Sequence, residues 1–321
     1  PTPAAATVAG VPAPAPAKPA PALPGPVSSP GTSEVEKLLA YLESGTNQVI
    51  GDHFKIGENG AIEQRTTTRA FALDRLYQED PTQAAAYALK VFESKDSAEE
   101  WAVALRNYIR ALPQPEEDAT LERVVRELLT HEPWRRQPTV GYLEAFDAAL
   151  FVKPEKVMPA VVEVVEENNL PQETRWAAWL TLERMSRQAT AEVLDYLNRN
   201  PDALAGELDT RASVFARTDV REARELEAAE AYLQRPDLTA GEVAKFFELI
   251  PNYTAHIAYA LISKPSFYNE YDQIQRDQWT LAILERWSDD PRFTPHRAVI
   301  NTAYLRLKQT LEDSGVPTSI P

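Results

Sequence analysis

Apolar side chains recur every three or four residues along most of the chain from position 66 onward. The clearest runs span residues 101–112, 121–129 and 243–250. This spacing places apolar side chains on one face of an α-helix and leaves the opposite face polar. We therefore predict an all-α fold in which each helix buries one face.

Capping residues mark the start of several of the expected helices. Three pairs that place a capping side chain before a proline are Asp80-Pro81, Asn200-Pro201 and Thr294-Pro295. Proline suits the first helical position because that residue needs no hydrogen-bonded N–H. Ser97 and Thr239 each stand three residues before a glutamate, which is the spacing of a capping box. Together these signals predict about 14 helices, joined by short turns and therefore antiparallel to their neighbours.

One segment, residues 48–64, departs from the helical period. Its apolar residues are Ile50, Phe54, Ile56 and Ile62, and they surround the dipeptide Asn59-Gly60. Asn-Gly suits the tight turn of a β-hairpin because both positions tolerate a positive φ. A small hairpin and an ordered loop both fit this pattern.

The stretch 155–185 has the pattern of a complete pair of helices with a proline inside the first. Pro159 lies within an apolar run, and after a short turn Arg175 is followed by Ala178 and Leu182. This order resembles the HEAT repeat, in which two antiparallel helices form one unit of a stacked solenoid. The spacing of arginine, alanine and leucine recurs after Arg69.

The resemblance to HEAT repeats implies a right-handed α-α superhelix over residues 32–321. In such a unit Pro159 would let its helix curve around the neighbouring helices while the helix stays continuous. Arg69 and Arg175 would act in packing and in hydrogen bonds between repeats, and would contact no ligand.

The first 31 residues differ in composition from the rest of the chain. Ten of the 26 prolines fall within the first 30 residues, where Lys18 is the one charged side chain. Such a segment has little to bury, so we expect a disordered, extended linker. Linkers of this kind commonly join an anchor or signal sequence to a folded domain. We therefore expect an exported protein, secreted, periplasmic or tethered at the cell envelope.

Net charge, composition and the lack of known motifs argue against several classes of function. The 33 basic and 48 acidic residues give a formal net charge of -15, which disfavours nucleic acid as a partner because phosphates are bound by clustered cations. There is no cysteine, and no apolar run is long enough to span a membrane. The four histidines show no metal-ligand spacing, and no nucleotide-binding or hydrolase motif is found. We expect no catalytic residue, cofactor or metal.

Aromatic residues gather in the last third of the chain. Trp279 and Trp287 share a helix face with Ile283, which predicts that both are buried in the core. Tyr268 and Tyr271 lie in a polar, loop-like stretch, where either packing or contact with a peptide or glycan would explain them.

Two functions remain after these exclusions. The first is a non-catalytic scaffold that binds a protein or peptide along its curved surface, with Tyr268 and Tyr271 as candidate contacts. The second is a helical enzyme or enzyme-associated domain that acts on a glycan or peptide through a carboxylate site. A buried acidic pair with a raised pKa would favour the second.

Overall fold

The computed structural model describes residues 32–57, 60–256, 258–263 and 269–318. The described α-helices are α1 (Glu34–Glu43), α2 (Thr68–Glu79), α3 (Pro81–Val91), α4 (Ala98–Ala111), α5 (Ala119–Thr130), α6 (Glu132–Arg136), α7 (Val140–Glu144), α8 (Pro154–Glu166), α9 (Gln172–Gln188), α10 (Thr190–Arg199), α11 (Leu208–Phe215), α12 (Ala223–Leu233), α13 (Ala240–Leu249), α14 (Glu270–Asp289) and α15 (Arg297–Asp313). Short 3-10 helices are η2 (Pro115–Glu117), η3 (Ala145–Phe151) and η4 (Pro291–His296). The predicted all-α class is confirmed. The Pro/Ala-rich segment 1–31 lies outside the described residues.

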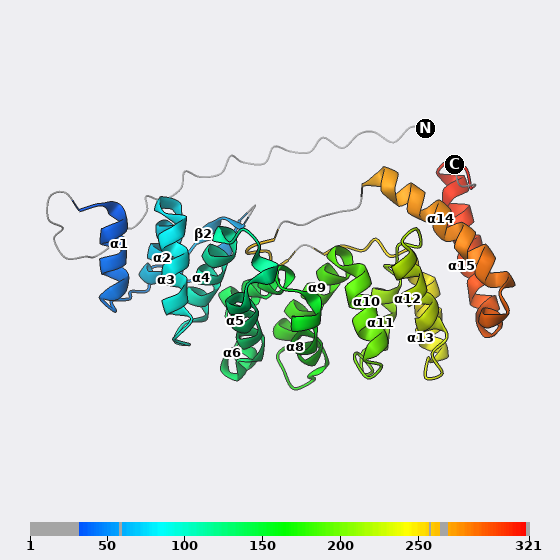
Figure 1. Ribbon diagram of the computed structural model, residues 1–321, viewed down its shortest axis with the longest axis horizontal. Helices are drawn as coiled ribbons and strands as arrows, with labels where there is room; N and C mark the ends of the chain where they lie inside the picture. The colour runs from blue at the N-terminus through cyan, green and yellow to red at the C-terminus, as the bar shows by residue number, and fades with distance from the viewer. Residues whose placement is uncertain (1–31, 58–59, 257, 264–268, 319–321) are drawn as a thin grey trace, which may run out of the picture.

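The helices follow one another in chain order along the longest axis of the molecule (Figure 1). They lie in two rows. The first row contains α3, α5, α8, α10 and α12, of which α5, α8, α10 and α12 pack on one another in turn. The second contains α2, α4, α7 with η3, α9, α11, α13 and α15, which pack in turn with little direct contact between α9 and α11. Paired helices such as α3 with α4 and α8 with α9 pack across the rows, and the apolar core runs continuously between them. The second row is the surface along which the candidate site is built.

Most of the predicted helix starts are confirmed. The Asp80 side chain accepts hydrogen bonds from the first turn of α3, with Pro81 at its start, and Ser97 and Thr239 cap α4 and α13. The predicted start at Asn200 is wrong. Its side chain donates to the carbonyl of Tyr196 at 2.8 Å and so caps the end of α10.

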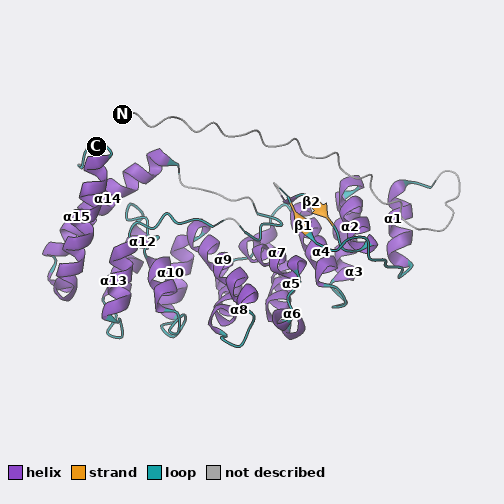
Figure 2. Cartoon of the chain, turned by 180° about the vertical axis from the view of Figure 1, so that it is seen from behind, coloured by secondary structure: helices purple, strands orange, loops and turns teal. Residues whose placement is uncertain are grey.

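Of the two alternatives left open for residues 48–64, a hairpin and an ordered loop, the structure has the hairpin. Strands β1 (Lys55–Ile56) and β2 (Ile62–Gln64) pair antiparallel, with Ile56 opposite Ile62 (Figure 2). Phe54 and Ile62 are buried against the helices. Gly60 has a φ of +69°, and a Cβ there would meet the carbonyl oxygen of Leu261 at 2.3 Å, so only glycine fits this approach.

Two further predictions concern single helices. Pro159 lies inside the one helix α8, so the prediction that the helix continues across it is confirmed. Trp287 is fully buried and Ile283 nearly so, but Trp279 is 39% exposed, so its predicted burial is wrong. Residues eight positions apart differ by roughly 80° in direction around a helix axis. When Trp287 points into the core, Trp279 therefore points toward the edge of the core.

Arginines near the start of second-row helices make two kinds of contact. They donate to a carbonyl at or just after the end of an earlier helix, and to a carboxylate at the start of the next second-row helix. Arg175, in the first turn of α9, donates from Nε to the carbonyl of Val165 at 3.1 Å. Its Nη2 donates to Glu207 Oε1 at 2.6 Å, at the start of α11. The Arg175 side chain therefore links α9 both to α8, which precedes it, and to the start of α11.

Arg211 repeats this arrangement one helix pair later, in a fully buried position. Its Nη1 donates to the carbonyl of Pro201 at 2.8 Å, and its Nε donates to Glu242 Oε1 at 2.6 Å, in the first turn of α13. The hydroxyl of Tyr232 donates to the same carboxylate oxygen at 2.8 Å. Burial raises the pKa of Tyr232 well above its usual range, which keeps the hydroxyl protonated as a donor.

Arg69 makes the corresponding contacts near the start of the array. It donates to the carbonyl of Leu42 at 2.5 Å and to Glu100 at 2.9 Å. The carboxylate follows the arginine by 31 residues for Arg69 and Arg211, and by 32 for Arg175. We call these three pairs the arginine ladder. Each of the three pairs therefore spans about one helix pair of the chain.

Removing the buried arginine of the ladder should be strongly destabilising. Arg211→Ala would leave Glu242 buried without its cation, so the free energy of unfolding should fall by about 3 to 5 kcal/mol. The matched control is Arg123→Ala, which removes the exposed i,i+4 pair with Glu127 and should cost less than about 1 kcal/mol. Urea unfolding followed by circular dichroism measures both, and equal losses would contradict a structural role for the ladder.

Candidate functional site

After α13 the chain turns back along the molecule. Residues 252–256 and 258–263, which we call the return segment, form neither helix nor strand. Figures 1 and 2 show them passing back across α10 and α9 toward the hairpin. The return segment lies mainly against elements that precede it by many residues: α11 and the residues after it, α9, α7 and η3. It also contacts α4 through Arg110, which donates to the carbonyl of Leu261, and α14 through the Tyr253 hydroxyl, which donates to Asp277 at 2.8 Å.

The first part of the return segment is held by α11 and the residues that follow it. The Asn252 N–H donates to the carbonyl of Ala216 at 2.9 Å, and its side chain donates to Ser213 Oγ at 3.0 Å. Arg217 donates to the carbonyl of Thr254 at 2.8 Å. Two of these three hydrogen bonds use main-chain groups of the return segment.

The middle part is held by two adjacent charged residues of α9. The Glu183 carboxylate lies 3.3 Å from the His256 N–H and 3.1 Å from His256 Nδ1. Arg184 donates to the carbonyl of Tyr259 at 2.7 Å and also to the carbonyl of Ala258. The negative carboxylate of Glu183 thus accepts from a main-chain N–H, and the positive guanidinium of Arg184 donates to main-chain carbonyls. Each charge therefore faces the main-chain dipole of opposite sign.

The last part is held by two carboxylates from α7 and η3. Glu144 Oε2 accepts from the Ala260 N–H at 2.9 Å. Asp147 Oδ2 accepts from the N–H groups of Ile262 and Ser263, both at 2.7 Å, and from the Ser263 hydroxyl at 3.0 Å. Main-chain N–H groups that donate to a carboxylate form charge-assisted hydrogen bonds, the stronger class. The second row therefore carries a surface that binds main-chain groups of a segment without helix or strand, which turns at Tyr259 with a φ of +51°.

Burial changes the acidity of both carboxylates. Burial, and then the nearby Asp147 charge, raise the pKa of Glu144 to about 7. Burial also raises the pKa of Asp147 to about 6, although the N–H donors of Ser263 and Ile262 oppose this rise. Near pH 7, Glu144 therefore exchanges between its protonated and ionised forms.

The return segment leaves some polar atoms of this surface unsatisfied. Within the described part of the chain, Asp147 Oδ1 and Arg184 Nε are buried and have no hydrogen-bond partner. Such groups are uncommon because each one costs desolvation free energy. The surface can therefore make more hydrogen bonds than the return segment uses.

An aromatic pair adjoins the middle of the return segment. Trp176 and Trp179 stack with ring centroids 4.7 Å apart, and His256 lies edge-on to both rings. Trp176 is 43% exposed. A cavity of about 240 Å³ beside the pair is also lined by Arg175 and Glu207. Exposed tryptophan next to a cavity is typical of contact surfaces in binding proteins.

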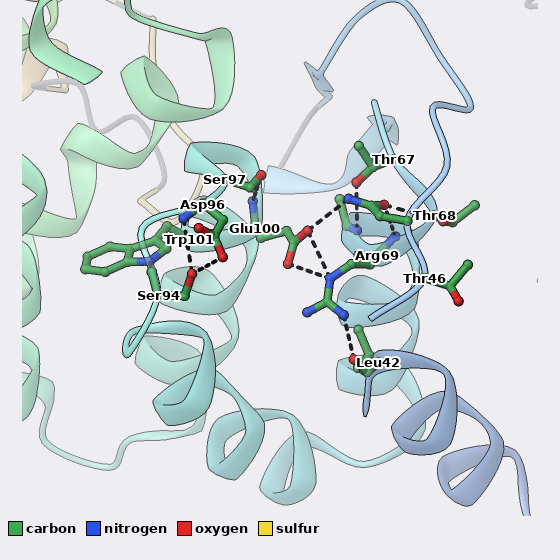
Figure 3. Close-up of polar contacts among 12 residues, drawn as sticks. Leu42, Thr46, Thr67, Thr68, Arg69, Ser94, Asp96, Ser97, Glu100 and Trp101 are labelled. Carbon is green, nitrogen blue, oxygen red and sulfur yellow. Dashed lines mark hydrogen bonds and ion pairs between the residues drawn. The ribbon is translucent and has the colours of Figure 1, made fainter. Parts of the chain in front are cut away.

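A larger cavity of about 460 Å³ lies at the other end of the array, between the end of α1, α3 and α4. Figure 3 shows Arg69 in its wall, directed at Glu100 and at the carbonyl of Leu42. Lys90 and Glu43, also in the wall, pair with each other at 2.5 Å. The charged groups are thus already matched among themselves, and this cavity is a weaker candidate than the surface under the return segment.

The two tyrosines predicted as binding residues do not join this surface. Tyr268 lies outside the described residues. Tyr271 is 72% exposed in the first turn of α14, where its hydroxyl accepts from Gln275 Nε2 at 3.1 Å. It is accessible to a partner, but none of the contacts above involves it.

The residues that form the surface were not singled out from the sequence. Glu144 and Asp147 do carry a usable signal, because they interrupt the apolar run 142–151. A charge in such a run is buried and must be paired. The sequence does not show that its partner is main chain more than a hundred residues away.

Comparison with known proteins does not identify a function for this chain. No family model, no curated protein and no solved structure matches this chain. Within the described residues, no cluster of three or more histidine or acidic side chains is arranged to hold a metal ion. Among the same residues, no helix is long and apolar enough to cross a membrane.

The raised pKa values predict how stability depends on pH. A carboxyl group whose pKa is raised by folding favours the folded state while it is protonated, so its contribution is lost as pH rises through the folded value. Between pH 5.5 and pH 7 the free energy of unfolding should therefore fall by about 2 kcal/mol through Glu144 and Asp147.

The double variant Glu144→Gln with Asp147→Asn keeps an acceptor oxygen at each position and cannot ionise. Its free energy of unfolding should fall less over the same pH range, by about the 2 kcal/mol assigned to the pair. Urea unfolding at several pH values gives the difference between the two proteins. A difference that does not change with pH would show that the two groups do not titrate in this range.

Proposed function

We propose that this chain is a non-catalytic HEAT-like α-solenoid, a right-handed superhelix that binds a protein or peptide partner in extended form along its second row of helices. The packed order of helix pairs supports the solenoid, as do the arginine ladder and the continuous helix at Pro159. Stacked helix pairs create long surfaces that suit such partners.

One observation carries the proposal. Charged side chains from α7, η3, α9 and the residues after α11 bind N–H and carbonyl groups of a non-helical chain, over residues 254–256 and 258–263, which turns at Tyr259 with a φ of +51°. Contacts of this kind depend on the main chain and on its direction more than on particular side chains. They give a polypeptide partner a basis for affinity, and the stacked Trp176 and Trp179 add a place for side-chain contact.

We also propose that the protein is exported and held at the cell envelope through its Pro/Ala-rich segment. The composition of residues 1–31 supports an extended spacer. A spacer of this kind would hold the binding surface away from the point of attachment.

The alternative function, an enzyme with a carboxylate site, has one observation in its favour. Glu144 and Asp147 are two neighbouring buried carboxyl groups with raised pKa values. Both, however, accept N–H groups of the return segment, and that use explains their position without catalysis. The scaffold is therefore the better supported function.

Photo-crosslinking of selected peptides tests the proposal. Random peptides are displayed against the full chain, and the enriched peptides are mixed with protein that carries benzoylphenylalanine in place of Trp176. Because Trp176 is exposed beside the proposed surface, light should join peptide to protein there. The matched control places the same group at Leu89, an exposed position on α3 in the first row, and should capture little.

Mass spectrometry of the captured peptides separates the two functions. The scaffold predicts intact peptides joined at position 176. Cleaved peptides would support the enzyme. Failure to enrich any peptide, or capture at position 89 alone, would contradict binding along the second row.

A further inference from the structure

We propose that the return segment is an internal occupant of the binding surface, and that the partner is an extended polypeptide which replaces it on the same side chains and runs in the same direction. This inference rests on the proposed polypeptide-binding function and adds to it the form of the ligand and a competition within the molecule. Three features of the structure support it.

The first feature is that the surface recognises main chain. Arg184 binds two successive carbonyls, and Glu144 and Asp147 bind three N–H groups between them. Every residue except proline carries these N–H and C=O groups. Another polypeptide that follows the same path, with the turn that Tyr259 makes at a φ of +51°, could therefore make the same contacts. The small residues Ala258 and Ala260 show that little side-chain volume is needed at two of the bound positions.

The second feature is that the return segment fits the surface incompletely. Asp147 Oδ1 and Arg184 Nε are unsatisfied within the described chain, although both residues are more than nine-tenths buried. The cavity of about 240 Å³ lined by Trp176 and Trp179 is also unfilled by protein. A partner with one more polar group near Asp147, and a side chain that enters this cavity, would use both.

The third feature is that the middle of the return segment is held through polar contacts. It is only half-buried, with Thr254 exposed, and the contacts described there are hydrogen bonds to Arg217 and Arg184. Leu261 and Ile262, at its end, are buried in the apolar core. A partner that replaces the return segment therefore needs apolar side chains at these two positions.

The test compares three forms of the full chain. The loosened form carries Ala260→Pro and Ile262→Pro, which remove N–H groups that donate to Glu144 and Asp147 and leave those carboxylates intact. The locked form carries Ser213→Cys and Asn252→Cys, at side chains in contact at 3.0 Å, in a sequence with no other cysteine. Thermal unfolding verifies that each form is folded.

Two probes are used with these forms. One is a fluorescent peptide with the sequence of residues 252–263, and the other is a peptide enriched in the display experiment. Anisotropy should show that the loosened form binds either probe about tenfold more tightly than the unmodified chain, because the internal competitor is weakened. The oxidised locked form should lose binding, and reduction of its disulfide should restore it.

A control peptide carries proline at the positions that correspond to Ala260 and Ile262. It should bind the loosened form about tenfold more weakly than the parent peptide, since it lacks the same two N–H donors. Equal affinity of the two peptides would show that the contact is not made through main chain and would overturn the proposal.

The outcomes also separate this inference from the proposed function. If the enriched peptide binds the locked, reduced and loosened forms equally, the chain binds polypeptides elsewhere, so the function stands and the inference is overturned. If the enriched peptide follows the predicted order and the 252–263 peptide does too, the inference is supported. If neither probe binds the folded loosened form, the inference and the polypeptide-binding function both fail.

Discussion

Pairing of buried charges between successive helix pairs is the constraint on which the structure depends. Arg69, Arg175 and Arg211 each join a carbonyl of the preceding turn to a carboxylate of the following repeat. An unpaired charge in these positions would cost several kcal/mol, so each arginine fixes the distance and rotation between two helix pairs. Apolar packing alone would tolerate small slips along the helices, whereas a forked guanidinium facing a carboxylate does not.

At the candidate site, charged side chains are also paired, but their partners are main-chain groups. In the arginine ladder each arginine meets a carboxylate as well as a main-chain carbonyl, and the pair of Arg211 with Glu242 is fully buried. In the surface under the return segment, Arg184, Glu144 and Asp147 are completed by main-chain groups. Main-chain dipoles satisfy a buried charge less fully than an opposite charge, in keeping with the raised pKa of both carboxyl groups. The molecule thus combines the arginine ladder, whose charges are paired with one another, with a surface whose charges bind main-chain groups that another polypeptide also carries.

The local parts of this architecture could be predicted from the sequence. Helix periodicity, the caps at Asp80, Ser97 and Thr239, the continuous helix at Pro159 and the hairpin follow from neighbouring residues, and the structure contains all of them. Thr210-Arg211 repeats the Thr-Arg pair of Thr174-Arg175, and was missed because the alanine and leucine that follow Arg175 are absent after Arg211.

The return segment could not be predicted because its partners are distant in the chain. Its main-chain contacts with Glu183, Arg184, Glu144 and Asp147 join residues 73 to 116 positions apart, and such contacts leave no periodic pattern. Tyr268 and Tyr271 were chosen as the aromatic residues in a polar stretch, while the aromatic pair beside the surface, Trp176 and Trp179, lies within an apparently ordinary helix. Their partial exposure depends on how α9 and α11 are spaced, which the sequence does not show.

The central claim is that the second row binds an extended main chain and that the return segment occupies this surface from within. Hydrogen exchange of the full chain, with and without a peptide enriched by display, tests it most directly. The account predicts that the amides of Ala260, Ile262 and Ser263 exchange faster when the peptide binds, while those of α9 remain protected. Unchanged exchange at these three amides under saturating peptide would contradict it.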